Sequence, residues 1–146
     1  MTHHITLNTM TRFKALLLSV ACLASLACGG DSATTVSASL AGTWNMTSAN
    51  GSSLPYVLQA ANPKIEILNE QIIFSSAGTF TITGNARVTN AGTVSNTPIT
   101  DAGTWTLTGN TVTAHFNSDN SNSSGVLSGN TLTVVETGFS AVFTKQ

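Results

Sequence analysis

The sequence predicts an all-β protein: a single antiparallel up-and-down β-barrel of eight strands, preceded by a signal peptide and a flexible tether. From residue 40 onward apolar and polar residues alternate with a period of two, which is typical of strands that bury one face. Gly-Asn and Ala-Gly-Thr segments separate the alternating runs and suit tight hairpin turns. Eight strands linked in this way can close on themselves, so that no sheet edge is left exposed.

The first 27 residues have the pattern of a signal peptide. Arg12 and Lys14 precede an uncharged apolar stretch at residues 15–27. That stretch is shorter than the about 20 residues that a membrane-spanning helix needs, and it matches the apolar region of a secretory signal. We therefore expect residues 1–27 to be a signal peptide, which starts at Met1 or at Met10.

The segment ends at Cys28, which follows the small residue Ala27 and precedes a polar Gly-Gly-Asp-Ser run. This arrangement resembles the lipobox of bacterial lipoproteins, although Ser25 stands where Leu is usual. The resemblance implies cleavage before Cys28 and acylation of its thiol. Cys22 is a rival site, and an ordinary signal peptide cut nearby is a further alternative.

A lipid on Cys28 would anchor the chain, because each buried methylene contributes about 0.8 kcal/mol. Residues 28–39 are small and polar and read as a lipidated, flexible tether. We expect a location in the bacterial cell envelope. Among lipoproteins, Gly29 rather than Asp after the cysteine favours the outer membrane, facing the periplasm or the cell surface.

Composition excludes several classes of partner. Only 8% of the residues are charged, and the chain after residue 27 has six acidic against three basic residues, a net charge of −3. We therefore expect no nucleic-acid binding. The two cysteines, Cys22 and Cys28, precede the barrel, so the barrel has no disulfide and no cysteine-based zinc site. We expect a monomer without a cofactor.

The alternation divides residues 40–146 into eight predicted strands. A long loop at residues 49–63 contains Pro55 and Pro63 and is expected to hold a helical turn at about 56–61. The expected strands lie at about 41–48, 64–74, 78–89, 97–108, 111–117, 123–128, 131–136 and 138–145.

Two of the expected strands contain an irregularity in sequence. In residues 64–74, Ile65 and Ile67 have one parity whereas Ile72 and Phe74 have the other. A β-bulge near residues 68–69 would reconcile them. In residues 78–89 the alternation continues in phase through a Gly-Asn pair at 84–85, which favours one bent strand over a turn.

Some of these residues point to a known family. Gly42-Thr43-Trp44, at the start of the first strand, resembles the G-x-W signature of lipocalins, and residues 50–55 and 143–145 resemble small bacterial lipocalin-like lipoprotein domains. The resemblance covers about residues 40–145. It implies that Trp44 seals the closed end of the barrel beside a basic residue, here Lys145 in place of the usual Arg.

The inward-facing residues are the best candidates for function. Barrels of eight strands either fill with side chains or hold one small apolar ligand. We expect a carrier of a small hydrophobic molecule, with a filled barrel that serves as a structural or protein-interaction module as the alternative. The candidate ligand-binding residues are Met46, Phe80, Ile82, Val88, Trp105, Leu107, Phe116 and Phe139.

No residue pattern indicates catalysis or a metal site, so we expect a protein that is not an enzyme. His115 faces outward by parity and lacks nearby partners, as catalytic triads and zinc sites require. Glu66 and Glu70, four apart on one strand, are interpreted as surface charges, as is Arg87. The polar segment 117–122 is interpreted as a hairpin tip rather than a calcium loop.

Overall fold

The protein is described by a computed structural model, which covers residues 39–146 and contains ten β-strands. The expected lipidation of Cys28, the signal peptide and most of the tether lie outside the described residues. Within the described part, no helix is long and apolar enough to cross a membrane. The strands are β1 (Gly42–Ala49), β2 (Ser52–Ser53), β3 (Tyr56–Gln59), β4 (Lys64–Phe74), β5 (Thr79–Asn90), β6 (Thr93–Thr108), β7 (Thr111–Phe116), β8 (Asn122–Ser128), β9 (Thr131–Glu136) and β10 (Phe139–Lys145).

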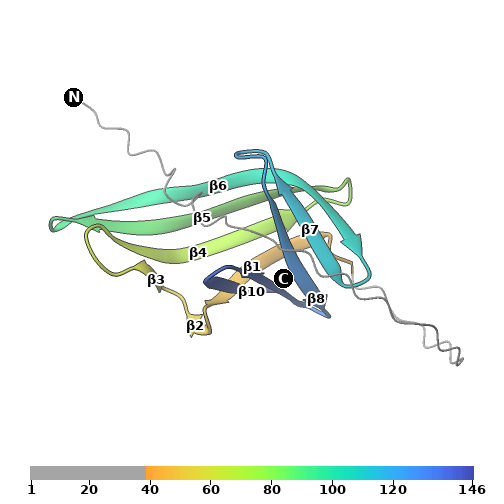
Figure 1. Ribbon diagram of the computed structural model, residues 1–146, viewed down its shortest axis with the longest axis horizontal. Helices are drawn as coiled ribbons and strands as arrows, with labels where there is room; N and C mark the ends of the chain where they lie inside the picture. Colours follow the sequence, from red (N-terminus) through yellow and green to blue (C-terminus); the bar gives the residue numbers. More distant parts are fainter. Residues whose placement is uncertain (1–38) are drawn as a thin grey trace, which may run out of the picture. The chain divides into compact units, whose positions relative to one another are not determined.

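Eight of these strands form a closed antiparallel barrel. The sheet runs from β1 through β10, β9, β8, β7, β6 and β5 to β4, and β1 also pairs with β4, which closes the circle. Figure 1 shows the consecutive hairpins and the first strand lying between β4 and β10. The predicted up-and-down barrel of eight strands is therefore confirmed.

Two local predictions are wrong. The expected helical turn at 56–61 is absent, because the first part of that segment is the strand β3, which pairs with β4 through Tyr56 and Ile67. The expected loop before the fourth predicted strand is also absent, because β6 begins at Thr93 rather than residue 97. Ala91 and Gly92 both have positive φ, so a two-residue turn joins β5 directly to β6. The resulting hairpin extends beyond the other strands (Figure 1).

The two clearest Gly-Asn hairpins differ from the expected turn in one detail. Gly109 and Gly129 have φ near +60°, at 59° and 57°, whereas neither following asparagine is among the described residues with positive φ. Positive φ at the first central residue alone is typical of a type II′ turn, which favours Gly there. The glycine is therefore the residue that these turns require.

The predicted bulge in β4 is confirmed. The pairing of β4 with β5 shifts register between Ile67 and Asn69, so Leu68 is the extra residue. On the far side of the bulge the even-numbered Ile72 and Phe74 become the buried ones. β5 continues opposite without interruption, as predicted for its Gly-Asn pair, and Gly84 faces the bulge.

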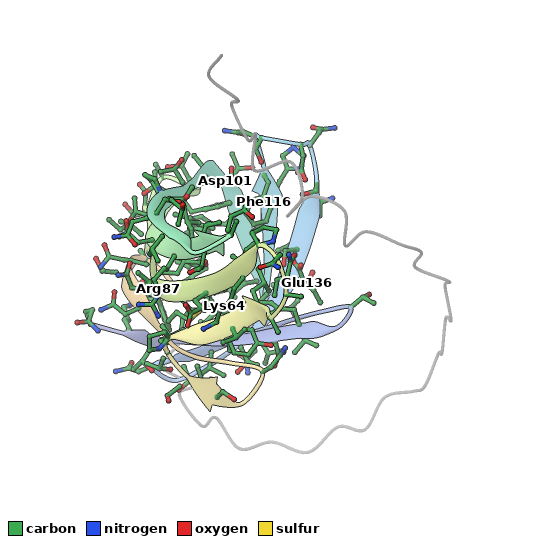
Figure 2. The ribbon with its side chains drawn as sticks, turned by 90° about the vertical axis from the view of Figure 1, so that its left-hand side faces the viewer. Lys64, Arg87, Asp101, Phe116 and Glu136 are labelled. Carbon is green, nitrogen blue, oxygen red and sulfur yellow. The ribbon has the colours of Figure 1, made fainter. Side chains whose placement is uncertain are left out.

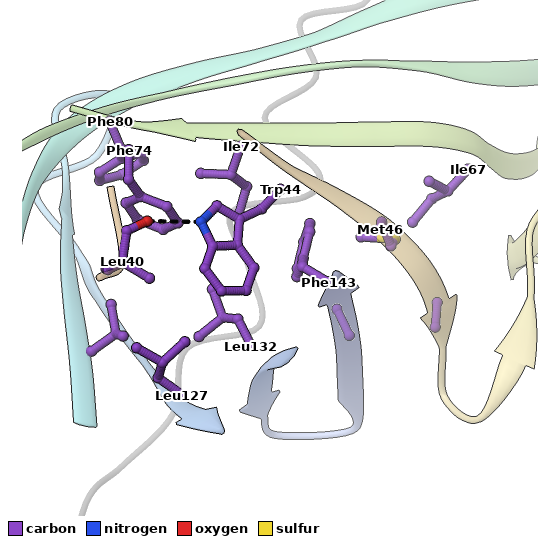
Figure 3. Close-up of a cluster of buried hydrophobic side chains, with 13 residues drawn as sticks. Leu40, Trp44, Met46, Ile67, Ile72, Phe74, Phe80, Leu127, Leu132 and Phe143 are labelled. Carbon is purple, nitrogen blue, oxygen red and sulfur yellow. Dashed lines mark hydrogen bonds between the residues drawn. The ribbon is translucent and has the colours of Figure 1, made fainter. Parts of the chain in front are cut away.

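The core fills the end of the barrel where the chain enters. The fully buried indole of Trp44 donates a hydrogen bond from Nε1 to the carbonyl oxygen of Leu40, at 2.8 Å (Figure 3). The Nζ atom of Lys145 lies 5.6 Å from the indole ring centroid, within the range of a cation–π contact, and donates to the backbone oxygen of Ser39. The predicted placement of Trp44 beside Lys145 is thus observed. Further buried side chains of this core are Ile72, Phe74, Phe80, Val112, Leu127, Leu132 and Phe143.

Gly84 offers a test of the bulge geometry. A Cβ atom at this position would lie 2.4 Å from the backbone oxygen of Asn69, which no side-chain rotation can relieve. We expect Gly84→Ala to lower the free energy of unfolding by about 1–3 kcal/mol, as for other overpacked sites. Thr83→Ala, at an exposed neighbouring position, is the control and should change it by about 0.5 kcal/mol or less. Urea unfolding measures both values, and equal stability of the two variants would contradict the assignment.

Candidate ligand cavity

A cavity of about 100 Å³ lies inside the barrel and is partly open to solvent. Seven barrel strands contribute to it, and the wall is almost entirely apolar. A wall of this kind favours apolar groups, which gain about 25 cal/mol for each Å² removed from water. The side chains that line it are Met46, Glu70, Ile72, Phe74, Phe80, Ile82, Val112, Ala114, Phe116, Ser123, Ser124, Leu132, Val134, Phe139, Ala141 and Phe143, together with Gly125.

The structure brings five of the eight candidate ligand-binding residues to this cavity and leaves three elsewhere. Met46, Phe80, Ile82, Phe116 and Phe139 line the wall. Their positions in the two-residue alternation were sufficient to predict that they face the interior.

The other three candidates lie along the barrel but not on the cavity wall. Trp105 packs edge-on against Phe74, with ring centroids 5.9 Å apart, and donates from Nε1 to two backbone oxygens of the β4–β5 turn. Leu107 packs against the core near the end of β6. Val88 pairs with Ile65 towards the projecting β5–β6 hairpin. Parity gives the face of a strand but not the depth along the barrel, which explains these misplacements.

Glu70 is the cavity residue that the sequence interpretation missed. It was interpreted as a surface charge that shares a face with Glu66, and this is wrong. The bulge at Leu68 reverses the parity of β4, so Glu70 joins Ile72 on the inner face while Glu66 stays on the outer face. The signal was present in the sequence, because the bulge inferred from the isoleucines moves Glu70 inward as well.

The carboxyl group of Glu70 has no partner within the described residues: no hydrogen bond or ion pair is formed there. Glu70 is half-buried, and the loss of hydration beside apolar side chains disfavours its ionised form and raises its pKa from 4.5 to about 7. The group therefore exchanges its proton near neutral pH. A cavity with one such group can distinguish ligands by the polar atom that they bring to it.

Glu66 is held by two cations on the outer face of the sheet and is only 7% exposed, so the expectation of a solvated surface charge is wrong for Glu66 too. It accepts a hydrogen bond from Nε of Arg87 at 2.8 Å, and Nζ of Lys64 lies 3.0 Å from its other carboxylate oxygen. Figure 2 labels both cations, on β5 and β4 respectively. The hydrogen bond from Arg87, then that from Lys64, lowers the pKa of Glu66 to about 2. Arg87 and Glu66 are therefore an ion pair rather than separate solvated charges.

Aromatic and polar contacts organise the opposite end from Trp44. Tyr56 on β3 packs edge-on against Phe139, with ring centroids 6.1 Å apart. Asn50 donates from Nδ2 to the Tyr56 hydroxyl at 2.7 Å and accepts from the backbone N–H of Ser140 at 2.7 Å. The segment between β1 and β4 is thereby tied to β10 beside Phe139, which itself lines the cavity.

The remaining polar candidates lie away from the cavity. His115 is on the outer face, as predicted, with Nδ1 2.9 Å from Oδ1 of Asn122. The polar segment after β7 is a hairpin connection in which Asp119 accepts from the backbone N–H of Ser121 at 3.0 Å. Within residues 39–146, no group of three or more His, Cys, Asp or Glu side chains could hold a metal ion.

A closed eight-stranded meander with an apolar interior defines the class of β-barrels that includes the lipocalins. The lipocalin-like domain family matches residues 40–134 of this sequence, about two thirds of the chain. The chain belongs to the lipocalin-like domain family, as the G-x-W segment and the meander predicted. A comparison with curated proteins found no match.

Glu70 and Glu66 make the free energy of unfolding depend on pH in opposite directions. The two effects fall in separate pH ranges. The pKa of Glu70 is raised on folding, so the free energy of unfolding should fall as the pH rises from 4.5 to about 7. The pKa of Glu66 is lowered, so its contribution is lost only as the pH falls from 4.5 towards about 2.

Glu70→Gln therefore has a pH-dependent effect on stability. Near about pH 4, below the ordinary pKa of 4.5, the Glu70 side chain is largely protonated in the folded and the unfolded protein, and the variant should match the wild type. Near about pH 8 the variant should be more stable by on the order of 2–3 kcal/mol, because its side chain at position 70 stays uncharged. Glu136→Gln removes an exposed carboxylate and controls for net charge. Urea unfolding at both pH values is the measurement, and a difference independent of pH would refute the burial of this charge.

Proposed function

We propose that this protein is a non-enzymatic, lipid-anchored binding protein of the bacterial cell envelope, whose barrel holds a small hydrophobic ligand. The observation that supports ligand binding is the apolar cavity inside the barrel. Family membership is consistent with this role. The wall supplies apolar contacts from most sides and very few polar groups, so a ligand would be held mainly through burial of its apolar surface.

The size of the cavity limits the ligand. Typical pockets for drug-sized ligands measure about 300–1,000 Å³, whereas this one measures about 100 Å³. An engineered apolar cavity of about 150 Å³ binds benzene. The ligand is therefore small or thin, such as a short alkyl chain, and any remaining part extends through the open side.

The proposed anchor is the lipid on Cys28. It is supported by the sequence alone, through the apolar stretch at 15–27, Ala27 before the cysteine and the polar residues after it. Acyl chains on Cys28 would hold the barrel at a membrane surface. For the membrane, we propose the outer membrane, facing the periplasm or the cell surface, and we propose that the protein acts as a monomer.

A second function, that of a protein-interaction module, is favoured by one observation. Val57 and Leu58 on β3 and Val94 on the β5–β6 hairpin are large apolar residues that are exposed to solvent. If the cavity binds no ligand, these segments would be the surface at which a partner protein binds.

Binding in the cavity can be tested with 1-hexanol, a thin neutral amphiphile. We expect a titration followed by NMR to shift the signals of cavity residues such as Ile82 and Phe116 in a saturable way. Ala114→Leu places a larger side chain in the cavity wall and should abolish the effect. Thr113→Leu adds similar bulk to the outer face of the same strand and should retain it. Saturable binding that survives Ala114→Leu would contradict a site in the barrel.

The anchor predicts which cysteine is acylated. In bacteria that express the full chain and are fed labelled palmitate, the wild type and Cys22→Ser should incorporate label and fractionate with membranes. Cys28→Ser should incorporate none. Label that disappears in Cys22→Ser and persists in Cys28→Ser would assign the lipid to the rival cysteine, and label in neither the wild type nor the variants would exclude lipidation.

A further inference from the structure

Glu70 is the one ionisable residue among the described residues that line the cavity. The other polar side chains there are Ser123 and Ser124 of β8. Directly opposite Glu70 on β5 is Gly84, which offers no side chain as a partner. Glu70 thus borders a space lined mostly by apolar side chains, and its carboxyl group has no protein partner in the described part of the chain.

The described residues include three lysines and arginines, and each has another partner. Lys64 and Arg87 bind Glu66 on the outer face of the sheet. Lys145 lies over the indole of Trp44 and donates to Ser39 at the closed end. His115 is on the outer face beside Asn122. No basic group from residues 39–146 is therefore available to neutralise a charge on Glu70.

Glu70 is half-buried, and an unpaired carboxylate beside an apolar wall is costly, because it loses part of its hydration without gaining hydrogen bonds in return. The cost disappears if a ligand supplies the missing cation, since an ammonium group donates charge-assisted hydrogen bonds to a carboxylate. A neutral hydroxyl group would form weaker hydrogen bonds, and an anion would be repelled. Charge complementarity thus selects a cation as the polar end of the ligand.

We propose that the barrel binds a thin lipophilic amine, whose ammonium group pairs with Glu70 and whose alkyl chain occupies the apolar cavity. This inference rests on the proposed function, since it requires that the cavity admit an apolar guest. The volume of about 100 Å³ suits an unbranched chain rather than a bulky ring system. Ile72 and Phe80, which line the wall, would contact the chain.

Protonation supports the same ligand chemistry. The loss of hydration raises the pKa of Glu70 to about 7, so this carboxyl group is largely uncharged below that value. A cation that pairs with the carboxylate must displace its proton, and an alkylamine remains protonated there because amines of this kind have a pKa of about 10. No other titratable side chain lines the cavity in the described part of the chain. Affinity for the amine should therefore rise about tenfold between about pH 6 and pH 8.

The test compares three ligands of equal chain length, hexylamine, 1-hexanol and hexanoate, by calorimetric titration of the full chain. Near about pH 8 we expect hexylamine to bind at least about tenfold more tightly than 1-hexanol, and hexanoate to bind more weakly than both. Glu70→Gln should reduce hexylamine affinity to the level of 1-hexanol and leave 1-hexanol unchanged. Glu136→Gln, with the same change in net charge at an exposed site, should change neither.

The outcomes separate this inference from the proposed function. If 1-hexanol and hexylamine bind equally well and Glu70→Gln has no effect, amine selection is wrong while hydrophobic binding stands. If none of the three ligands binds, both proposals are wrong. Should Glu70→Gln fail to fold, the pH dependence of hexylamine binding to the wild type decides, and an affinity that does not change between about pH 6 and pH 8 would overturn the pairing with Glu70.

Discussion

One extra residue in β4 determines what the interior of this barrel contains. Side chains on a strand alternate between two faces, and a bulge reverses that alternation beyond the point of insertion. Leu68 is the inserted residue, and the reversal allows Ile67 on one side and Ile72 and Phe74 on the other to reach the same core. Glu70 is carried inward with them. The apolar core and the inward position of Glu70 thus have the same structural cause.

The bulge requires a specific partner on β5. Gly84 lies opposite Glu70, and a Cβ atom at this position would lie 2.4 Å from the Asn69 oxygen and 3.1 Å from the Glu70 Cα, so no larger residue fits without movement. A single glycine on β5 therefore permits the close approach of the two strands at the bulge.

The two ends of the barrel differ in a way that positions the cavity. At the closed end, Trp44 is held by the Leu40 carbonyl and covered by Lys145, so the interior there is filled. At the other end, Tyr56 and Phe139 form an edge-on pair that Asn50 connects to β10. The cavity includes Phe139 at this end and extends inward to Leu132 and Val112.

The architecture could be predicted from the sequence because it depends on local patterns. Alternation and Gly-Asn pairs identified the eight barrel strands, and the parity conflict between Ile67 and Ile72 identified the bulge. Features that depend on non-local pairing could not be predicted in this way. The strand β3 exists because Tyr56 and its neighbours pair with an edge of β4, although the segment between two prolines has no strand pattern.

The site was predicted in part, for the same reason. Parity placed Phe80 and Phe116 at the cavity, but the depth of Trp105 and Leu107 along the barrel depends on the tilt of strands around a closed sheet. The inward position of Glu70 could have been predicted by applying the change of parity at the inferred bulge to the residues that follow it. The lack of a partner for Glu70 in the described residues could not be predicted from the sequence. It depends on the pairing of Lys64 and Arg87 with Glu66.

The central claim, that β4 changes parity at Leu68 and turns Glu70 inward, is tested most directly by cysteine accessibility. In a chain whose own Cys22 and Cys28 are replaced by Ser, single cysteines would be placed by Asn69→Cys, Glu70→Cys, Ile72→Cys and Ile73→Cys. The account predicts rapid reaction with a polar thiol reagent at positions 69 and 73 and slow reaction at positions 70 and 72. Rapid reaction at positions 70 and 72 with protection at 69 and 73 would contradict it.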